Sequence, residues 1–153
     1  MTYVFTKISG LPENQIMGSG TILDTARLRY GLSEHFKVAQ GNIHAYVFGE
    51  HGDTSFIPWT GAYISGLSTD EYYEEMKAHG KDVKPLDKEA MLEYVQKSGG
   101  KVIAKKGATF YAVSATVCQL VGLILAASDS LATVSSMLHG DCLLYTSDAA
   151  DEG

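Results

Sequence analysis

An uncharged run, residues 107–128, constrains the fold of this chain more than any other feature of its sequence. A run of this length has to be buried, either in a bilayer, which needs about 20 consecutive apolar residues, or in a protein core. In hydrocarbon every polar side chain would need a partner, whereas a helix in a soluble core can satisfy such groups. The run carries several of them: Thr109, Tyr111, Ser114, Thr116 and Gln119. We therefore expect a buried core helix rather than a membrane span.

The overall composition agrees with a soluble globular domain. The chain has 153 residues, of which 45% are hydrophobic and 20% charged, enough to bury a core in one domain. Its 18 acidic and 12 basic residues give a net charge of -6, which offers no attraction for nucleic acid or an anionic membrane. Two cysteines, Cys118 and Cys142, are too few for a disulfide scaffold, and residues 1–10 do not resemble a secretory signal. The expected location is the cytoplasm.

Hydrophobic periodicity and turn residues predict a mixture of helices and strands. The clearest element is an amphipathic helix over 23–36, with an acidic residue in its first turn. A compact apolar run over 43–48 indicates a buried strand. Between 68 and 106 the sequence is charged and helical, with solvated charged faces and Gly99-Gly100 interrupting the second helix. The other expected elements are a short apolar element at 3–8, a short strand leading into a turn at 18–20, and a strand at 131–138.

The segment Gly18-Ser19-Gly20 raises the question of nucleotide binding. The dinucleotide fingerprint G-x-G-x-x-G requires a third glycine where this chain has Leu23, and no strand-to-helix unit with an acidic residue follows at the required distance. We interpret the segment as a flexible exit from a strand before a helix.

Asp24, Arg27 and His51 form the candidate catalytic group. His51 lies between two glycines just after the expected strand, on adaptable backbone, while Asp24 and Arg27 are three residues apart and share a helix face. A carboxylate that accepts from one imidazole nitrogen favours the protonated ring and leaves the other nitrogen to exchange a proton. A guanidinium can bind a substrate carboxylate with two hydrogen bonds. Spacing leaves the alternative open, an ordinary Asp-Arg helical pair and an unrelated loop histidine.

A metal site would have to use His44, His51 and Asp53. His44 lies inside the expected strand, so the two imidazoles need not face the same place. Neither an H-E-x-x-H motif nor a cysteine pair supports such a site, and we expect no metal.

Three motifs, in this order, resemble the bacterial L-lactate dehydrogenases of the lactate/malate dehydrogenase family. They read GSGTILDTARLR at 18–29, GEHGD at 49–53 and KGAT at 106–109. The resemblance implies an α+β fold, with the substrate domain of that family over 21–141. Residues 1–20 would be a remnant of the NAD-binding Rossmann domain, its last strand and helix. Residues 142–153 continue neither periodicity and can be encoded by a transposon-end sequencing adapter, so we interpret them as an artefact.

The resemblance also implies roles for individual residues. His51 would be the general acid/base that protonates the pyruvate carbonyl as hydride arrives from NADH, with Asp24 as its orienting partner. Arg27 would hold the substrate carboxylate, and Thr109 would line the pocket near the methyl end of the substrate.

Assembly and regulation follow from the same resemblance. It implies a homotetramer, and allosteric members of the family bind fructose 1,6-bisphosphate between subunits through residues that match Arg29 and His44. Two cations that repel at an interface until a bisphosphate bridges them would favour one quaternary state. Glu50 and Trp59 look like the lactate branch of the family.

The sequence therefore predicts part of a cytoplasmic, NAD-dependent L-lactate dehydrogenase acting on a small 2-hydroxy or 2-oxo acid. The chain lacks the family's glycine fingerprint for NAD and its mobile-loop arginine, so we expect the isolated fragment to be inactive. A malate or other 2-hydroxy acid dehydrogenase is the alternative within this class. The alternative outside it is a non-enzymatic binding or assembly module.

Overall fold

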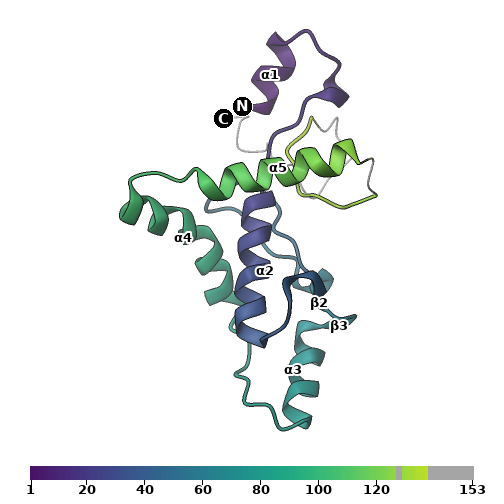
Figure 1. Ribbon diagram of the computed structural model, residues 1–153, viewed down its shortest axis with the longest axis vertical. Coiled ribbons are helices and arrows are strands. Elements are labelled where there is room, and N and C mark those ends of the chain that lie inside the picture. Colours follow the sequence, from purple (N-terminus) through teal and green to yellow (C-terminus); the bar gives the residue numbers. More distant parts are fainter. Residues whose placement is uncertain (127–128, 138–153) are drawn as a thin grey trace.

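The computed structural model describes residues 1–126 and 129–137, which form α-helices and one small sheet (Figure 1). The α-helices of this part are α1 (Thr2–Ile8), α2 (Ile22–Phe36), α3 (Thr69–Ala78), α4 (Lys88–Lys106) and α5 (Tyr111–Leu125). Strands β1 (Ile43–His44), β2 (Tyr63–Ile64) and β3 (Leu67–Ser68) form an antiparallel sheet in the order β1-β2-β3. Short 3-10 helices lie in the connections: η1 (Glu13–Gln15), η2 (Gln40–Asn42) and η3 (Trp59–Gly61).

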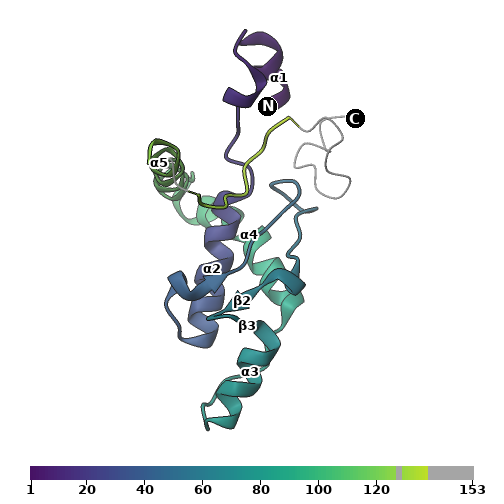
Figure 2. The same cartoon turned by 90° about the vertical axis from the view of Figure 1, so that its right-hand side faces the viewer.

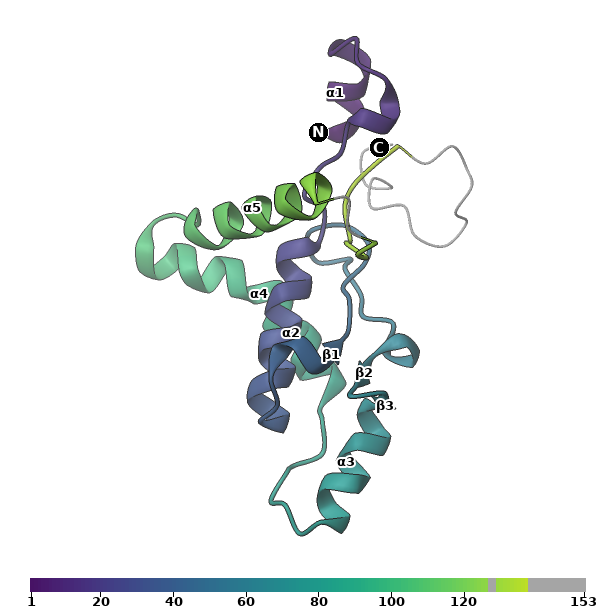
Figure 3. The same cartoon turned by 45° about the vertical axis from the view of Figure 1, so that its right-hand side comes forward.

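Helix α2 is at the centre of the packed core, between α4 on one side and the small sheet on the other (Figure 3). Its apolar residues recur every four positions, so Leu28, Leu32 and Phe36 lie on one face, and all three are completely buried. The other buried apolar side chains of the described residues are Ile43, Ala45, Val47, Ile57, Ala62, Ile64 and Val95. The apolar core of this part of the chain therefore lies entirely within residues 28–95.

Helix α4 is held close to α2 because α2 has a glycine at the contact. A Cβ at Gly31 would lie 2.7 Å from Met91 Sδ and 3.2 Å from Tyr94 Cε1. The residue before the helix, Asp87, is its N-cap, and its side chain accepts a hydrogen bond from the Ala90 amide at 2.9 Å. Its position beside α2 matters for the site described below.

Helices α1 and α5 lie outside the core. Figures 1 and 2 show α5 crossing the first turn of α2, and α1 beyond α5 at one end of the molecule. Together the two helices bury only Thr2, Thr6 and Thr116. Most of their large apolar side chains are exposed: Tyr3, Val4, Phe5, Ile8, Tyr111, Val117, Val121, Ile124 and Leu125. Residues 111–125 of the uncharged run are thus helical as expected, but the expectation that this helix is buried is wrong.

A bridge joins the segment before α2 to the segment after α5. The Gly18 amide donates to the Ser135 carbonyl at 2.7 Å, and the Ser135 amide donates to the Gly18 carbonyl at 3.1 Å. The hydroxyls of Thr2 and Ser135 share a further hydrogen bond of 2.9 Å. Gly20 has a φ of +50°, and a Cβ there would lie 2.7 Å from the Thr133 carbonyl oxygen, so the close approach requires glycine.

The helix expected at 23–36 is confirmed as α2, and the charged helical region 68–106 contains α3 and α4. The interruption expected at Gly99-Gly100 is wrong, because α4 runs through both glycines. The strand expected at 43–48 is only two residues long, since its partner β2 pairs with Ile43 and His44 alone.

The strand expected at 131–138 is not present in the described residues 131–137. Between residues 131 and 137 the only paired position is the bridge at Ser135, and Leu138 lies outside the described residues. In residues 1–20 the structure has α1, η1 and a single bridge at Gly18 in place of the short strand expected before the turn at 18–20. Residues 138–141 of the expected substrate domain, and all of 142–153, lie outside the described residues. No helix in the part of the chain that the structure describes is long and apolar enough to cross a membrane.

Candidate active site

The start of α2 is tied to the extended segment that leads toward His51. The hydroxyl of Thr21 donates to the Val47 carbonyl at 2.6 Å, and the Val47 amide donates to the Thr25 hydroxyl at 3.0 Å. Both threonines are buried. Because hydrogen bonds shielded from water fix the relative position of two elements, the first turns of α2 hold Asp24 at a defined distance from the loop carrying His51.

His51 is carried by the loop 49–55, which a two-residue bridge closes at its base. Phe48 and Phe56 exchange two backbone hydrogen bonds, each of 3.0 Å. Within the loop, the Thr54 hydroxyl donates to Glu50 Oε2 at 2.7 Å. Hydrogen bonds therefore hold the loop both at its base, between Phe48 and Phe56, and between the side chains of Glu50 and Thr54.

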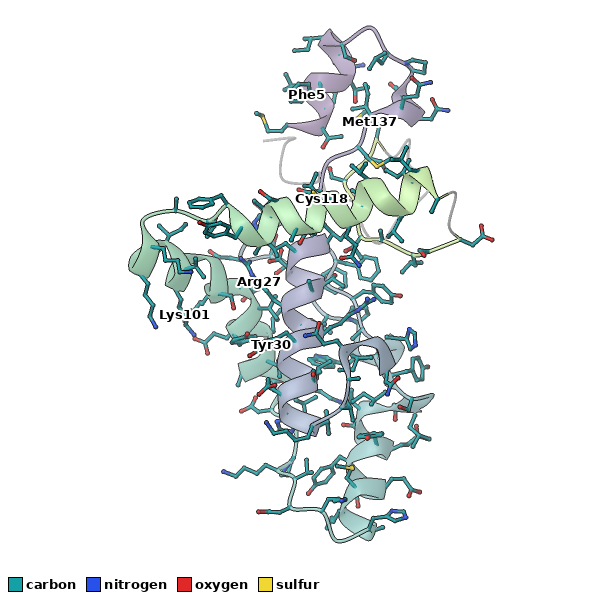
Figure 4. All side chains as sticks on the ribbon, viewed as in Figure 1. Phe5, Arg27, Tyr30, Lys101, Cys118 and Met137 are labelled. Atoms are coloured by element: carbon teal, nitrogen blue, oxygen red, sulfur yellow. The ribbon has the colours of Figure 1, made fainter. Side chains whose placement is uncertain are left out.

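Asp24 binds His51 and Arg27 with its two carboxylate oxygens. His51 Nδ1 donates to Asp24 Oδ2 at 2.5 Å, and Arg27 Nη1 donates to Asp24 Oδ1 at 3.0 Å. The Asp24 side chain is only 5% exposed, while that of Arg27 is 15% exposed and that of His51 62%. Figure 4 shows Arg27 on the side of α2 that faces α4, next to α5. A buried carboxylate thus orients both groups, and His51 is not an unrelated loop histidine.

The hydrogen bond to Asp24 raises the pKa of His51 above its ordinary value of 6.5. Partial burial opposes this, because it disfavours the charged ring, and the charge of Asp24 adds to the increase. Smaller effects come from Arg27, whose charge lowers the pKa, and Glu50, whose charge raises it. With Nδ1 bonded to Asp24, Nε2 is the ring nitrogen left to exchange a proton with a ligand.

A cavity of about 470 Å³ adjoins this group, and Asp24, Arg27 and His51 all line it. Thr109, in the connection between α4 and α5, lines the same cavity, so the structure brings together all four residues expected at the substrate site. Gly99 of α4 also contributes to the wall. A Cβ there would lie 3.7 Å from both terminal nitrogens of Arg27, so the glycine leaves room beside the guanidinium.

Arg29 and His44 line a second cavity, of about 440 Å³. Arg29 Nε donates to the Ala45 carbonyl at 3.1 Å, and its guanidinium carbon lies 4.7 Å from the centre of the Tyr46 ring. The structure therefore brings together the two residues expected at an effector site, on a different cavity from that of His51.

Sequence reasoning missed the contribution of α4 to the first cavity. Gln96 and the pair Gly99-Gly100 line it, whereas the sequence predicts only a helix break at the two glycines. Two adjacent glycines inside a helix cost about 1 kcal/mol each relative to alanine, which is a signal for a close approach or an open space. Gln96 stands in no recognisable motif, and nothing in the sequence marks it.

The fit of the site to metals and to a dinucleotide can be tested on the residues present. Within residues 1–126 and 129–137, no group of three or more His, Cys, Asp or Glu side chains could hold a metal ion. A Cβ at Gly18 would lie 2.7 Å from Thr2 Oγ1, and the space beside Gly20 is filled by the backbone at Thr133. These glycines serve close packing of the chain on itself, so the 18–20 segment does not fit the phosphates of a dinucleotide.

Comparison with known proteins places the chain in a family. Residues 21–147 match the family described as lactate/malate dehydrogenase, alpha/beta C-terminal domain. The chain belongs to this family. It is 44% identical over 140 residues to the L-lactate dehydrogenase of Acetivibrio thermocellus and to L-lactate dehydrogenase 1 of Clostridium acetobutylicum. The matched region covers 92% of this chain but 43% and 44% of those proteins, so the chain spans less than half the length of the curated relatives it matches.

Solved structures of the lactate/malate dehydrogenase family share the fold. The structure superposes on an L-lactate dehydrogenase from Clostridium thermocellum with a TM-score of 0.77 at 35% identity, covering 91% of this chain and 43% of that one. A lactate dehydrogenase from a Medee basin deep-sea metagenome library gives a TM-score of 0.84 at 31% identity, covering 94% and 46%. The fold class expected from the sequence, the C-terminal domain of this family, is confirmed.

Proposed function

We propose that this chain is part of an L-lactate dehydrogenase, an oxidoreductase that interconverts pyruvate and L-lactate with NAD(H). The observation that carries the proposal is the buried Asp24 carboxylate, which accepts from His51 at 2.5 Å and from Arg27 at 3.0 Å beside one cavity. The names of the relatives support it, since they are L-lactate dehydrogenases. NADH would supply the hydride, and the described residues would supply the proton and the binding site for the substrate anion.

His51 acts as the proton donor when the carbonyl is reduced. Its raised pKa keeps the ring protonated further into the neutral range, and Asp24 stabilises that charge before the proton leaves. As the carbonyl oxygen gains negative charge, the proton on Nε2 passes to it, and the ring becomes neutral. In the reverse direction the neutral ring takes the proton from the hydroxyl of L-lactate.

Arg27 binds the carboxylate of the substrate. Its bond to Asp24 holds one terminal nitrogen of the guanidinium, and Gly99 leaves room beside the terminal nitrogens. A fixed guanidinium can bind a carboxylate through charge-assisted hydrogen bonds and so place the carbonyl carbon near His51. Thr109 lines the cavity around the remainder of the substrate.

The test is replacement of His51 by asparagine in a complete protein that contains this chain. We expect the rate of NADH-dependent pyruvate reduction to fall by about 10²–10⁴-fold, because the proton donor is lost. Binding of NADH, followed by its fluorescence, should persist. The matched control is His79→Asn, at the exposed end of α3, which should leave the rate unchanged.

Retained turnover in the His51→Asn protein would overturn the proposal. The same assay with oxaloacetate in place of pyruvate distinguishes the alternative activity. A clear preference for oxaloacetate would assign the protein to the malate dehydrogenases of the family.

We further propose that the complete protein is a cytoplasmic homotetramer whose second cavity binds fructose 1,6-bisphosphate through Arg29 and His44. Both residues line that cavity, and a guanidinium and an imidazole can both donate hydrogen bonds to phosphate oxygens. We expect Arg29→Gln and His44→Gln to reduce the ratio of rates measured with and without the bisphosphate. Equal ratios in these variants and the parent would contradict this assignment.

A further inference from the structure

Gln96 connects α4 to the loop that carries His51. Its side-chain amide nitrogen lies 3.0 Å from the Asp53 carbonyl oxygen, 3.1 Å from the Ser55 carbonyl oxygen and 3.3 Å from Ser55 Oγ, and it donates to these three acceptors. An amide group has two hydrogens, so one of them is shared between two acceptors. A single side chain of α4 therefore binds the loop at two residues, Asp53 and Ser55.

Ser55 continues this connection toward His51. The Ser55 hydroxyl donates to the Gly52 carbonyl at 2.9 Å, and the Gly52 amide donates to the Glu50 carbonyl at 2.9 Å. These bonds fix the peptide groups on both sides of His51. Ser55 is only 5% exposed, so water does not readily replace its partners.

The helix that carries Gln96 is itself fixed relative to α2. Val95, the preceding residue, is completely buried in the core, and Tyr94 and Met91 pack closely at Gly31. Because Asp24 lies on α2, the amide of Gln96 is held at a defined distance from the carboxylate that His51 must reach. By contrast, the His51 side chain is 62% exposed, so packing does little to hold its ring.

We propose that Gln96 is a positioning residue for His51: from α4 it holds the loop 49–55 so that Nδ1 of the imidazole meets Asp24. This inference rests on the proposed role of His51 as proton donor. Gln96 does not act on the substrate in this account. It limits the positions of the loop, and so raises the fraction of molecules in which the ring is oriented for proton transfer.

The readout is the pKa of His51, because it depends on the contact with Asp24. The charges that act on His51 are those of Asp24 and Arg27 from α2 and Glu50 from the loop. On α4, Lys97 interacts electrostatically with Asp53 of the loop. Gln96→Met removes the amide without changing any charge, so a change in the pKa of His51 in this variant reports a change in its contact with Asp24.

The experiment is an NMR titration of the imidazole of His51 in the chain as it exists. In Gln96→Met we expect the pKa of His51 to fall toward 6.5, whereas Gln15→Met, the same substitution in η1, should leave it unchanged. Ser55→Ala removes one hydroxyl of the same connection and should lower the pKa by a smaller amount. In an Asp24→Asn background, Gln96→Met should have no further effect, since the contact that it supports is already lost.

An unchanged pKa in folded Gln96→Met and Ser55→Ala proteins would overturn the proposal, as would an equal shift in the Asp24→Asn background. Loss of folding in both variants, with Gln15→Met folded, would also overturn it, because Gln96 would then support the fold rather than His51. The titration does not depend on turnover. A lowered pKa in a protein whose complete form does not reduce pyruvate would leave the positioning role intact and remove only the proposed function.

Discussion

Helices α2 and α5 are both 15 residues long, but one face of α2 is buried whereas α5 is largely exposed. α2 contains charged residues and yet buries five side chains, among them Leu28, Leu32 and Phe36. α5 contains no charged residue and buries only Thr116. The apolar content of a helix does not decide whether it is buried. A helix is buried where a neighbouring element packs against it, as α4 and β1 pack against α2.

The candidate site lies where these two helices meet. Asp24 and Arg27 come from the start of α2, and Thr109 lies just before α5 (Figure 1). One part of the cavity wall is therefore fixed by the packed core, and another part belongs to a helix with little packing around it. The comparison predicts that substitutions on the α2 side change stability far more than those on α5.

The largest difference is expected for a matched pair of leucines. Leu32 of α2 is completely buried, and Leu125 of α5 is 81% exposed. Leu32→Ala should lower the free energy of unfolding by about 2–5 kcal/mol, since it leaves a cavity, while Leu125→Ala should change it by less than about 0.5 kcal/mol. Urea denaturation followed by circular dichroism measures both. Similar losses in the two variants would show that α5 is covered in solution.

A smaller effect is expected for Asp24→Asn, which removes the shared partner of His51 and Arg27. Because Asp24 is buried, the free energy of unfolding should fall by about 1–3 kcal/mol.

A raised pKa in the folded state means that protonated His51 stabilises the protein fully below pH 6.5. This contribution is lost as the pH rises through the pKa of His51 in the folded state. The exposure of His51 keeps this term small, and Asp24→Asn should remove it.

The measurement is urea denaturation of both proteins at several pH values across the neutral range. Asp70→Asn is the control, since its ion pair with Lys88 lies at the surface. If Asp24→Asn retained the parent's decline in stability over this range, another group would have to account for it.

The smallest effect concerns two glycines, Gly100 in α4 and Gly20 just before α2. A Cβ at Gly100, inside α4, meets nothing within 4 Å, so Gly100→Ala should raise the free energy of unfolding by up to about 1 kcal/mol. Gly20→Ala should lower it, because the new Cβ would contact the backbone at Thr133 from a φ of +50°. Thermal unfolding of the two variants compares them directly. Equal shifts of the same sign would mean that the backbone contact at Gly20 does not form in solution.

The sequence predicted α2 well because its evidence is local. Apolar spacing and an acidic first turn define the helix, and the separation of Asp24 and Arg27 is enough to place them on one face. It did not predict the exposure of α5 or the short β1, since both depend on which distant segments lie nearby. Gly99 and Gly100 have weak helix propensity, and the packing around Val95 outweighs it.

The candidate site likewise has a part that local sequence predicts and a part that depends on distant contacts. The spacing of Asp24 and Arg27 indicated a pair, but whether His51 joins it depends on the loop closed by Phe48 and Phe56, a contact between separate segments. The role of Gln96 consists of hydrogen bonds to residues more than 40 positions away, for which a glutamine on a helix gives no signal.

The hydrogen bond between Thr2 and Ser135 joins residues 133 positions apart, and this has a kinetic consequence. Closing so long a loop carries a large entropic cost, and few buried apolar side chains surround the contact to offset it. The Gly18–Ser135 bridge should therefore be among the last contacts to form in folding and the first to open by local unfolding. Since each residue is the other's hydrogen-bond partner, their amide protons would exchange with solvent together, and faster than those of α2. We therefore expect the segments around Gly18 and Ser135 to separate and pair again together while the core around α2 stays folded.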